Sequence, residues 1–146
     1  MTPKIEIAEP PNFALIVAVF PEAVKPGVIF AYGDTIFNPS GVEIPPALIA
    51  HECTHLERQT GYVPERLNPI IWWDRYLRDP EFRYDEELYA HVAEFEAQLE
   101  GFIDRNQRAQ LLMRTARRLI APLYQYPTTF TLQLAMRDIE RAYRGA

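Results

Sequence analysis

The sequence predicts an α+β fold in which a small sheet of two to three strands packs on a mainly helical body. Short runs rich in β-branched and aromatic residues, separated by turn residues, occur before residue 40. Apolar residues at helical spacing dominate after residue 45. Hydrophobic residues make up 48% of the 146 positions, which is enough for one core. We therefore expect residues 1–146 to form a single domain.

The first forty positions are expected to supply the strands. Residues 1–11 predict an irregular or extended arm that ends at two prolines. Residues 12–20 fit a short helix, but their β-branched side chains fit a strand equally well. Two strands are predicted at 28–32 and 35–37, with a hairpin-like break between them.

Helices are expected over the remainder, because prolines and capping side chains stand where helices begin and glycines stand where two of them end. The expected helices cover residues 45–59, 70–78, 79–100, 104–124 and 129 or 131 to 144. The second of these carries Trp72 and Trp73, for which we expect a role in the core.

The charge is unevenly distributed along the chain. The net charge is −5, yet the last third is basic, and all eight of its basic residues are arginine. These arginines either form a solvated face that pairs with the acidic body or form a patch for an anionic partner. No basic motif with interleaved aromatic residues is present, so nucleic acid is not an expected partner.

The cysteine content and the hydropathy pattern predict a cytoplasmic location. Cys53 is the only cysteine, which excludes an internal disulfide and fits a reducing compartment. We expect it to be a small buried hydrophobic residue. The most apolar run, 13–20, is too short to span a bilayer and lacks the features of a secretory signal, so no membrane association is expected.

One motif carries chemistry. The sequence AHECTHL at residues 50–56 lies inside the helix expected at 45–59. His51 and His55 share a helix face and can present two imidazoles to one Zn²⁺, while Glu52 can reach a water on that metal. Zinc lowers the pKa of such a water to about 7, and a glutamate then serves as general base. The motif therefore predicts a metallohydrolase, with satisfied core or surface histidines as the alternative.

A catalytic zinc needs a third protein ligand. The helix expected at 79–100 offers Glu86, Glu87 and His91. The residues alone do not decide among these three, and an exposed acidic face without metal is a further alternative.

The HECTH motif followed by a glutamate-rich helix resembles the gluzincin metallopeptidases. The resemblance implies Glu87 as the third ligand, since Glu87 and Ala90 match the family pattern on the second helix. His91 stands where that family has an aspartate, so it either supports a zinc-bound imidazole or is itself a ligand. Glu86 is an alternative ligand or a supporting neighbour. Family members also place a tyrosine or histidine near the oxyanion, which makes Tyr124 a candidate transition-state stabiliser among several tyrosines.

Two longer stretches, 28–59 and 70–91, are similar to small zincin-like proteins of tailed bacteriophages and prophages. This resemblance implies a zincin-like fold in the cytoplasm of a bacterial host. In zincins the strand before the active helix often pairs with the substrate as an added strand, which would assign 35–37 to a sheet edge.

Three functional hypotheses follow. The first is a zinc-dependent peptidase that acts on a peptide or protein substrate. The second is a non-catalytic zinc-binding structural or assembly protein of a phage or prophage. The third is a regulator that binds an anionic partner through Arg114, Arg117 and Arg118. No oligomeric state is predicted.

Overall fold

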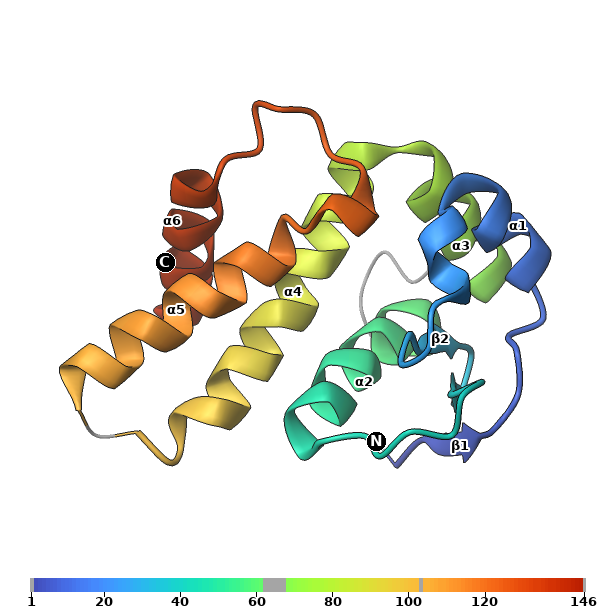
Figure 1. Cartoon of the computed structure of the whole chain (residues 1–146), viewed down its shortest axis with the longest axis horizontal. Helices are drawn as coiled ribbons and strands as arrows, with labels where there is room; N and C mark the ends of the chain where they lie inside the picture. Colours follow the sequence, from blue (N-terminus) through green and yellow to red (C-terminus); the bar gives the residue numbers. More distant parts are fainter. Residues whose placement is uncertain (1, 62–67, 103, 146) are drawn as a thin grey trace.

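The computed structural model describes residues 2–61, 68–102 and 104–145 and confirms the α+β class (Figure 1). The protein is 63% helical and has a small mixed sheet of three strands. The strands are β1 (Lys4–Glu6), β2 (Phe30–Tyr32) and β3 (Thr35–Phe37). The helices are α1 (Phe13–Val19), α2 (Pro46–Thr60), α3 (Pro69–Arg78), α4 (Pro80–Leu99), α5 (Arg105–Leu119) and α6 (Leu132–Tyr143), and two 3₁₀ turns are η1 (Pro21–Val24) and η2 (Pro122–Tyr124).

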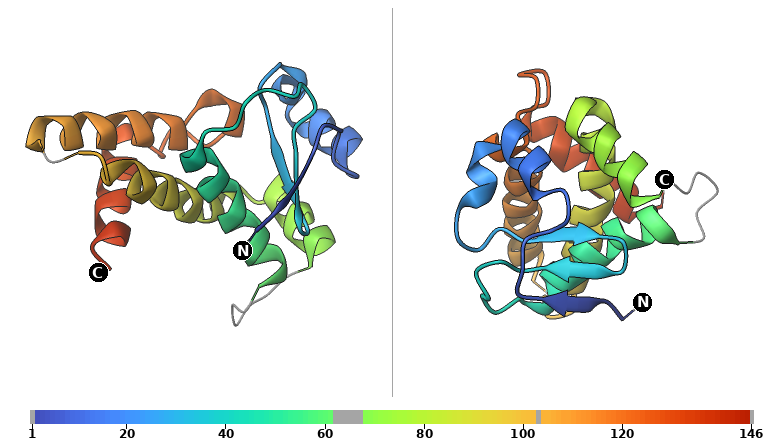
Figure 2. Two further views of the ribbon diagram at one scale, coloured as in Figure 1. Left: turned by 90° about the horizontal axis from the view of Figure 1, so that it is seen from below. Right: turned by 90° about the vertical axis from the view of Figure 1, so that its right-hand side faces the viewer.

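The sheet has the strand order β1-β3-β2 (Figure 2). Ile36 of β3 pairs with Ile5 of β1 in parallel and with Ala31 of β2 in antiparallel orientation. The prediction that residues 35–37 form the edge is therefore wrong. The N-terminal arm folds back and pairs with β3. The edge of the sheet that lies next to α2 is therefore formed by β2.

Residues 13–19 form a helix, so the alternative of a strand at this position is wrong. Ile16 and Phe20, one helical turn apart, both enter a core cluster that also contains Phe30, Trp72 and other side chains. Packing into this cluster favours a helix, in which residues one turn apart share a face, over a strand, in which successive side chains point to opposite faces. Among the described residues, no helix combines the length and apolar character that crossing a bilayer requires.

Helix α2 lies between the sheet and α4, and its two faces differ in chemistry. Leu56 is fully buried and packs with Ala31 and Ile36 of the sheet. The face that carries His51 and His55 is turned toward α4. The same fifteen-residue helix thus anchors to the sheet and holds the motif against the acidic helix.

A second core joins α4, α5 and α6 away from the sheet (Figure 1). Leu119 and Ile139 are fully buried within it. Helix α5 ends at Leu119 rather than at 124, because Pro122 has no N–H for a helical hydrogen bond and begins a separate 3₁₀ turn. Gln125 then adopts a left-handed conformation with φ of 55°, which turns the chain back over the body.

Candidate metal site

The motif side chains lie in the interior of α2, where the helix is regular from Pro46 to Thr60. Pro46 suits the first helical turn, since its missing N–H would have no partner there. His51 and His55 are each 4% exposed, and Glu52 is also buried. The rings of the two histidines meet edge to face, with centroids 5.0 Å apart. The spacing of four residues therefore places both imidazoles together in a dry region.

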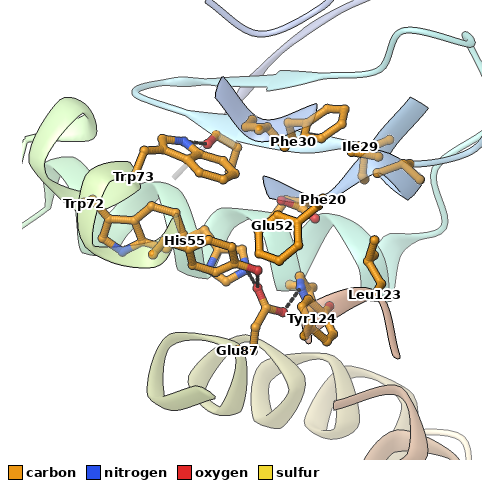
Figure 3. Close-up of a pocket in the computed structure, with 16 residues that line it drawn as sticks. Phe20, Ile29, Phe30, Glu52, His55, Trp72, Trp73, Glu87, Leu123 and Tyr124 are labelled. Atoms are coloured by element: carbon orange, nitrogen blue, oxygen red, sulfur yellow. Dashed lines mark hydrogen bonds and ion pairs between the residues drawn. The ribbon is translucent and has the colours of Figure 1, made fainter. Parts of the chain in front are cut away.

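Glu87 of α4 meets both imidazoles (Figure 3). Its Oε1 lies 3.3 Å from Nε2 of His51, and its Oε2 lies 3.0 Å from Nε2 of His55. Two ligands that each lie about 2.0–2.1 Å from a tetrahedral Zn²⁺ are separated from each other by roughly 3.3 Å. The two distances from Glu87 are close to this separation, and the three side chains offer donor atoms that all lie within 4.8 Å of one another.

Within the ranges that the structure describes, the hydrogen bonds around Glu87 leave one of its two carboxylate oxygens without a donor. Its Oε2 accepts a hydrogen bond of 2.8 Å from the hydroxyl of Tyr76. Its Oε1 is buried and accepts no hydrogen bond within the described part of the chain, although His51 Nε2 is near. A buried carboxylate oxygen without a donor is costly unless a cation balances it. The donor set of two imidazoles and one carboxylate fits zinc.

The electrostatics couple His51 to two carboxylates. Burial by itself lowers the pKa of His51, but Glu87 and Glu94 outweigh burial and raise that pKa to about 10. Burial likewise opposes ionisation of Glu87, yet His55 and His51 lower the pKa of Glu87 well below its usual range. In the metal-free protein the site is therefore held together by an ion pair between the predicted ligands.

Glu52 faces the same space but lies outside the group of converging ligand atoms. Burial raises the pKa of its carboxyl, while the charges of His51 and His55 oppose that rise. A general base has to lie beside the metal ligands without being one of them. Glu52 has this position relative to the candidate ligands.

Glu94 is a neighbour that the sequence analysis missed. It lies on α4 and is buried, with Oε2 3.4 Å from Nδ1 of His51. A carboxylate at the second nitrogen of an imidazole fixes the orientation of the ring and strengthens it as a ligand. Glu94 also pairs with Arg118 of α5. Its spacing of seven residues from Glu87 places both on one face of α4, which was an available signal.

His91 lies beside this arrangement. Its Nδ1–H donates a 2.7 Å hydrogen bond to the backbone carbonyl of Glu87, and its ring meets that of His51 at 4.6 Å. Burial and then the charge of His51 lower the pKa of His91 to about 3, so the ring is neutral. His91 groups with His51 and Glu94 rather than with the His51, His55 and Glu87 set.

Glu86 does not belong to either group of candidate ligands. Its Oε1 accepts a 2.6 Å hydrogen bond from the indole N–H of Trp72, and its other oxygen pairs with Arg58. Trp72 in turn packs edge-on against His55, with centroids 5.3 Å apart. Glu86 therefore supports the site through Trp72, and the alternative of Glu86 as a ligand is not supported by this geometry.

Two tyrosines stand near Glu87. The sequence analysis missed Tyr76, which donates to Glu87 from α3. Tyr124, in η2, lines the cavity beside the motif. Burial and then the charge of Glu87 raise the pKa of Tyr124 well above its usual value, so its hydroxyl keeps its proton as a donor. Tyr84 is committed elsewhere, since its hydroxyl donates to Asp138 at 2.8 Å.

The remaining predicted features lie at the margins of the site. Cys53 is only partly buried, so the prediction of a buried cysteine is wrong in degree. Trp72 and Trp73 are both core residues, as expected, and both also line the cavity. Arg118 reaches the acidic body at Glu94, while Arg114 and Arg117 are exposed on α5.

A cavity of about 90 Å³ adjoins the three candidate ligands (Figure 3). His51, Glu52, His55 and Glu87 form its polar wall. The opposite wall is apolar and includes Ile16, Phe20, Ala23, Ile29, Phe30 and Leu123. Any molecule that reaches the candidate ligands therefore also meets this apolar wall.

Comparisons of the chain with protein-family models, with curated proteins and with solved structures each found no match. The resemblance to zincin-like proteins thus rests on the motifs in the sequence, and it stays a prediction.

Proposed function

We propose that this protein is a zinc-dependent hydrolase and most specifically a peptidase. The observation that carries the proposal is the convergence of His51, His55 and Glu87 at ligand spacing, beside a cavity that Glu52 also lines. Two imidazoles, one carboxylate and a cavity at the open side correspond to a zinc site with a free position. His51, His55 and Glu87 would hold the ion.

Zinc, when bound, would act as a Lewis acid that lowers the pKa of a water to about 7 and polarises a substrate carbonyl. Glu52 would serve as the general base that accepts a proton from that water and passes it to the leaving amine. Glu52 suits this role because it is buried at the cavity wall without being a ligand candidate.

The surrounding residues hold these groups in place. Tyr76 fixes Glu87 through one carboxylate oxygen, and Glu94 orients His51 through its second nitrogen. Tyr124 offers a protonated hydroxyl at the cavity, where it would donate to the oxyanion of the transition state.

An edge of the sheet lies beside the cavity and offers backbone pairing to a peptide substrate. Residues 28–31, which lead into the edge strand β2 and include its first two residues, line the cavity. The outward carbonyl of Ala31 already accepts hydrogen bonds from Gln59 and Trp73 at 3.1 and 3.0 Å. Strand addition is therefore left to the residues before Phe30.

The test compares wild type with Glu52→Gln, and with Glu57→Gln as the matched control on the exposed face of the same helix. We expect one zinc per chain in all three proteins by metal analysis. A peptide library should be cleaved by wild type and by the control, with chelator-sensitive activity, and about 10²- to 10⁴-fold more slowly by Glu52→Gln.

Three outcomes would contradict the proposal in whole or in part. If the protein contains no zinc after loading, the proposed metal site is wrong. If Glu52→Gln cleaves peptides as fast as wild type, the role of Glu52 as general base is wrong. If zinc binds and its removal unfolds the protein, while no peptide is cleaved under any condition, the peptidase assignment fails and the non-catalytic zinc-binding alternative is favoured.

A further inference from the structure

The apolar wall of the cavity is built from segments that are far apart in the sequence. Phe20 comes from the end of α1, Ala23 from η1, Phe30 from β2 and Leu123 from η2. Phe20, Ala23 and Phe30 are each no more than 5% exposed. The cavity is therefore a constructed part of the core and not a gap between surface loops.

This wall is fixed by packing and by hydrogen bonds. The ring of Phe20 meets that of Tyr76 edge-on at 6.3 Å. The Gln125 side chain donates a 2.8 Å hydrogen bond to the carbonyl of Val19, which ties η2 to α1 across the cavity. Arg83 donates to the carbonyl of Tyr124 at 2.9 Å from the other side. The cavity is thus preformed, and an occupant need not order it.

The chemistry of the wall selects an apolar occupant. A polar group placed against Phe20, Phe30 and Leu123 would lose its water without gaining hydrogen bonds. An apolar cavity of about 150 Å³ accommodates benzene, so a volume of about 90 Å³ corresponds to about three or four carbons. That is the size of a valine, leucine or isoleucine side chain, and it is too small for an aromatic ring.

We propose that this cavity is a specificity pocket for an aliphatic side chain of three or four carbons next to the scissile bond. The proposal rests on the proposed hydrolase function, because the polar wall supplies the chemistry while the apolar wall supplies the selection. Ala23 sets the depth of the pocket, since a longer side chain there would fill it.

The test measures binding and not turnover. The probes are the N-acetyl hydroxamates of leucine, alanine and phenylalanine, titrated by calorimetry into the zinc-loaded protein. We expect the leucine probe to bind about tenfold or more tightly than the alanine probe, and the phenylalanine probe to bind no better than leucine. Equal affinities for leucine and alanine would overturn the proposal.

Three variants locate the selectivity. Ala23→Leu should reduce the affinity of the leucine probe to that of the alanine probe. Leu123→Ala, at a half-buried position, enlarges the pocket with less risk to folding and should favour the phenylalanine probe over leucine. Val24→Ala is the matched control, because Val24 is 61% exposed and lies outside the wall, and it should leave the order of affinities unchanged. Selectivity that no pocket variant alters would refute the assignment.

A zinc-free measurement separates this proposal from the function on which it rests. Isovaleramide should raise the melting temperature of the metal-free wild type at millimolar concentration, acetamide should not, and Ala23→Leu should abolish the effect. If zinc fails to bind while isovaleramide still stabilises, the hydrolase assignment fails and the apolar pocket stands. If isovaleramide and acetamide act alike, the pocket assignment is wrong.

Discussion

Zinc binding at neutral pH is expected to release a proton from His51. The carboxylates of Glu87 and Glu94 lie 3.3 and 3.4 Å from its two ring nitrogens, and they raise the pKa of His51 to about 10. An imidazole that binds zinc must give up the proton on the ligating nitrogen. At pH 7 nearly every His51 ring carries this proton, so zinc must displace it in order to bind.

The size of this competition follows from the pKa. The interval between pH 7 and a pKa of about 10 corresponds to about 4 kcal/mol, or roughly a thousandfold loss of zinc affinity at pH 7. Affinity should thus rise about tenfold per pH unit between pH 6 and 8 because of this group alone. The expected release is at least one proton per zinc.

Calorimetric titration of zinc in two buffers with different ionisation enthalpies gives the number of released protons directly. Glu94→Gln removes one of the two carboxylates that raise the pKa of His51, so it should reduce the release at pH 8. Glu57→Gln, exposed on the same helix, should leave the release unchanged. An identical apparent enthalpy in both buffers for the wild type would show that zinc displaces no proton and would refute this account of the site.

Four further predictions concern stability and support of the site. In the metal-free protein the raised pKa of His51 stabilises the folded state. This contribution is fully present below about pH 6.5 and is lost as pH rises toward about 10, so the melting temperature should fall over that interval. A melting temperature that does not change with pH would contradict this. Trp72→Phe removes the indole donor to a buried carboxylate oxygen of Glu86, and it should cost about 1–3 kcal/mol in urea unfolding and weaken zinc binding about tenfold; unchanged zinc affinity would exclude the supporting role. Asp79→Ala deletes the side-chain cap of α4 and should cost about 0.5–2 kcal/mol without altering zinc affinity in a competition assay. Ile139→Ala, at a fully buried position in the α4–α6 core, should cost about 2–5 kcal/mol in urea unfolding, and a cost below 1 kcal/mol would show that this core collapses around the gap.

The pairing of His51 with His55 was predictable because it is a property of one helix. Four residues separate them, and any regular helix places them on one face. The position of Glu87 beside both imidazoles was expected only through the resemblance, because the sequence alone offered three candidates on the same helix. In the structure Glu86 is bonded to Trp72 and belongs to neither group of candidate ligands, whereas His91 groups with His51 and Glu94 and not with the set that contains Glu87.

Glu94 and Tyr76 were missed because their contacts depend on how whole helices cross. Glu94 reaches His51 only because α4 runs along α2 for at least two turns beyond Glu87. Tyr76 reaches Glu87 from a different helix, α3, and the six residues 62–67 that precede α3 lie outside the described ranges. Local patterns identify faces, but not the neighbour that each face meets.

The sheet shows the same limit. Both strands of the hairpin were predicted, since a short break between β-branched runs is a local signal. The parallel pairing of Lys4–Glu6 with the second of them joins residues about thirty positions apart, and no turn encodes it. That one unforeseen pairing moved residues 35–37 from the edge to the centre.

The hydrogen bond from Gln125 to Val19 spans 106 positions. The candidate zinc ligands and their buried supports all lie between residues 51 and 94, so during synthesis they leave the ribosome well before residue 125. Of the residues named for the apolar wall, only Leu123 follows the candidate ligands in the sequence, so a nascent chain can gather those ligands and most of the wall before Leu123 is synthesised. Loop closure over this distance is entropically expensive, which makes it a late event in folding. A chain synthesised only to residue 94 would carry every candidate ligand while its apolar wall still lacked Leu123.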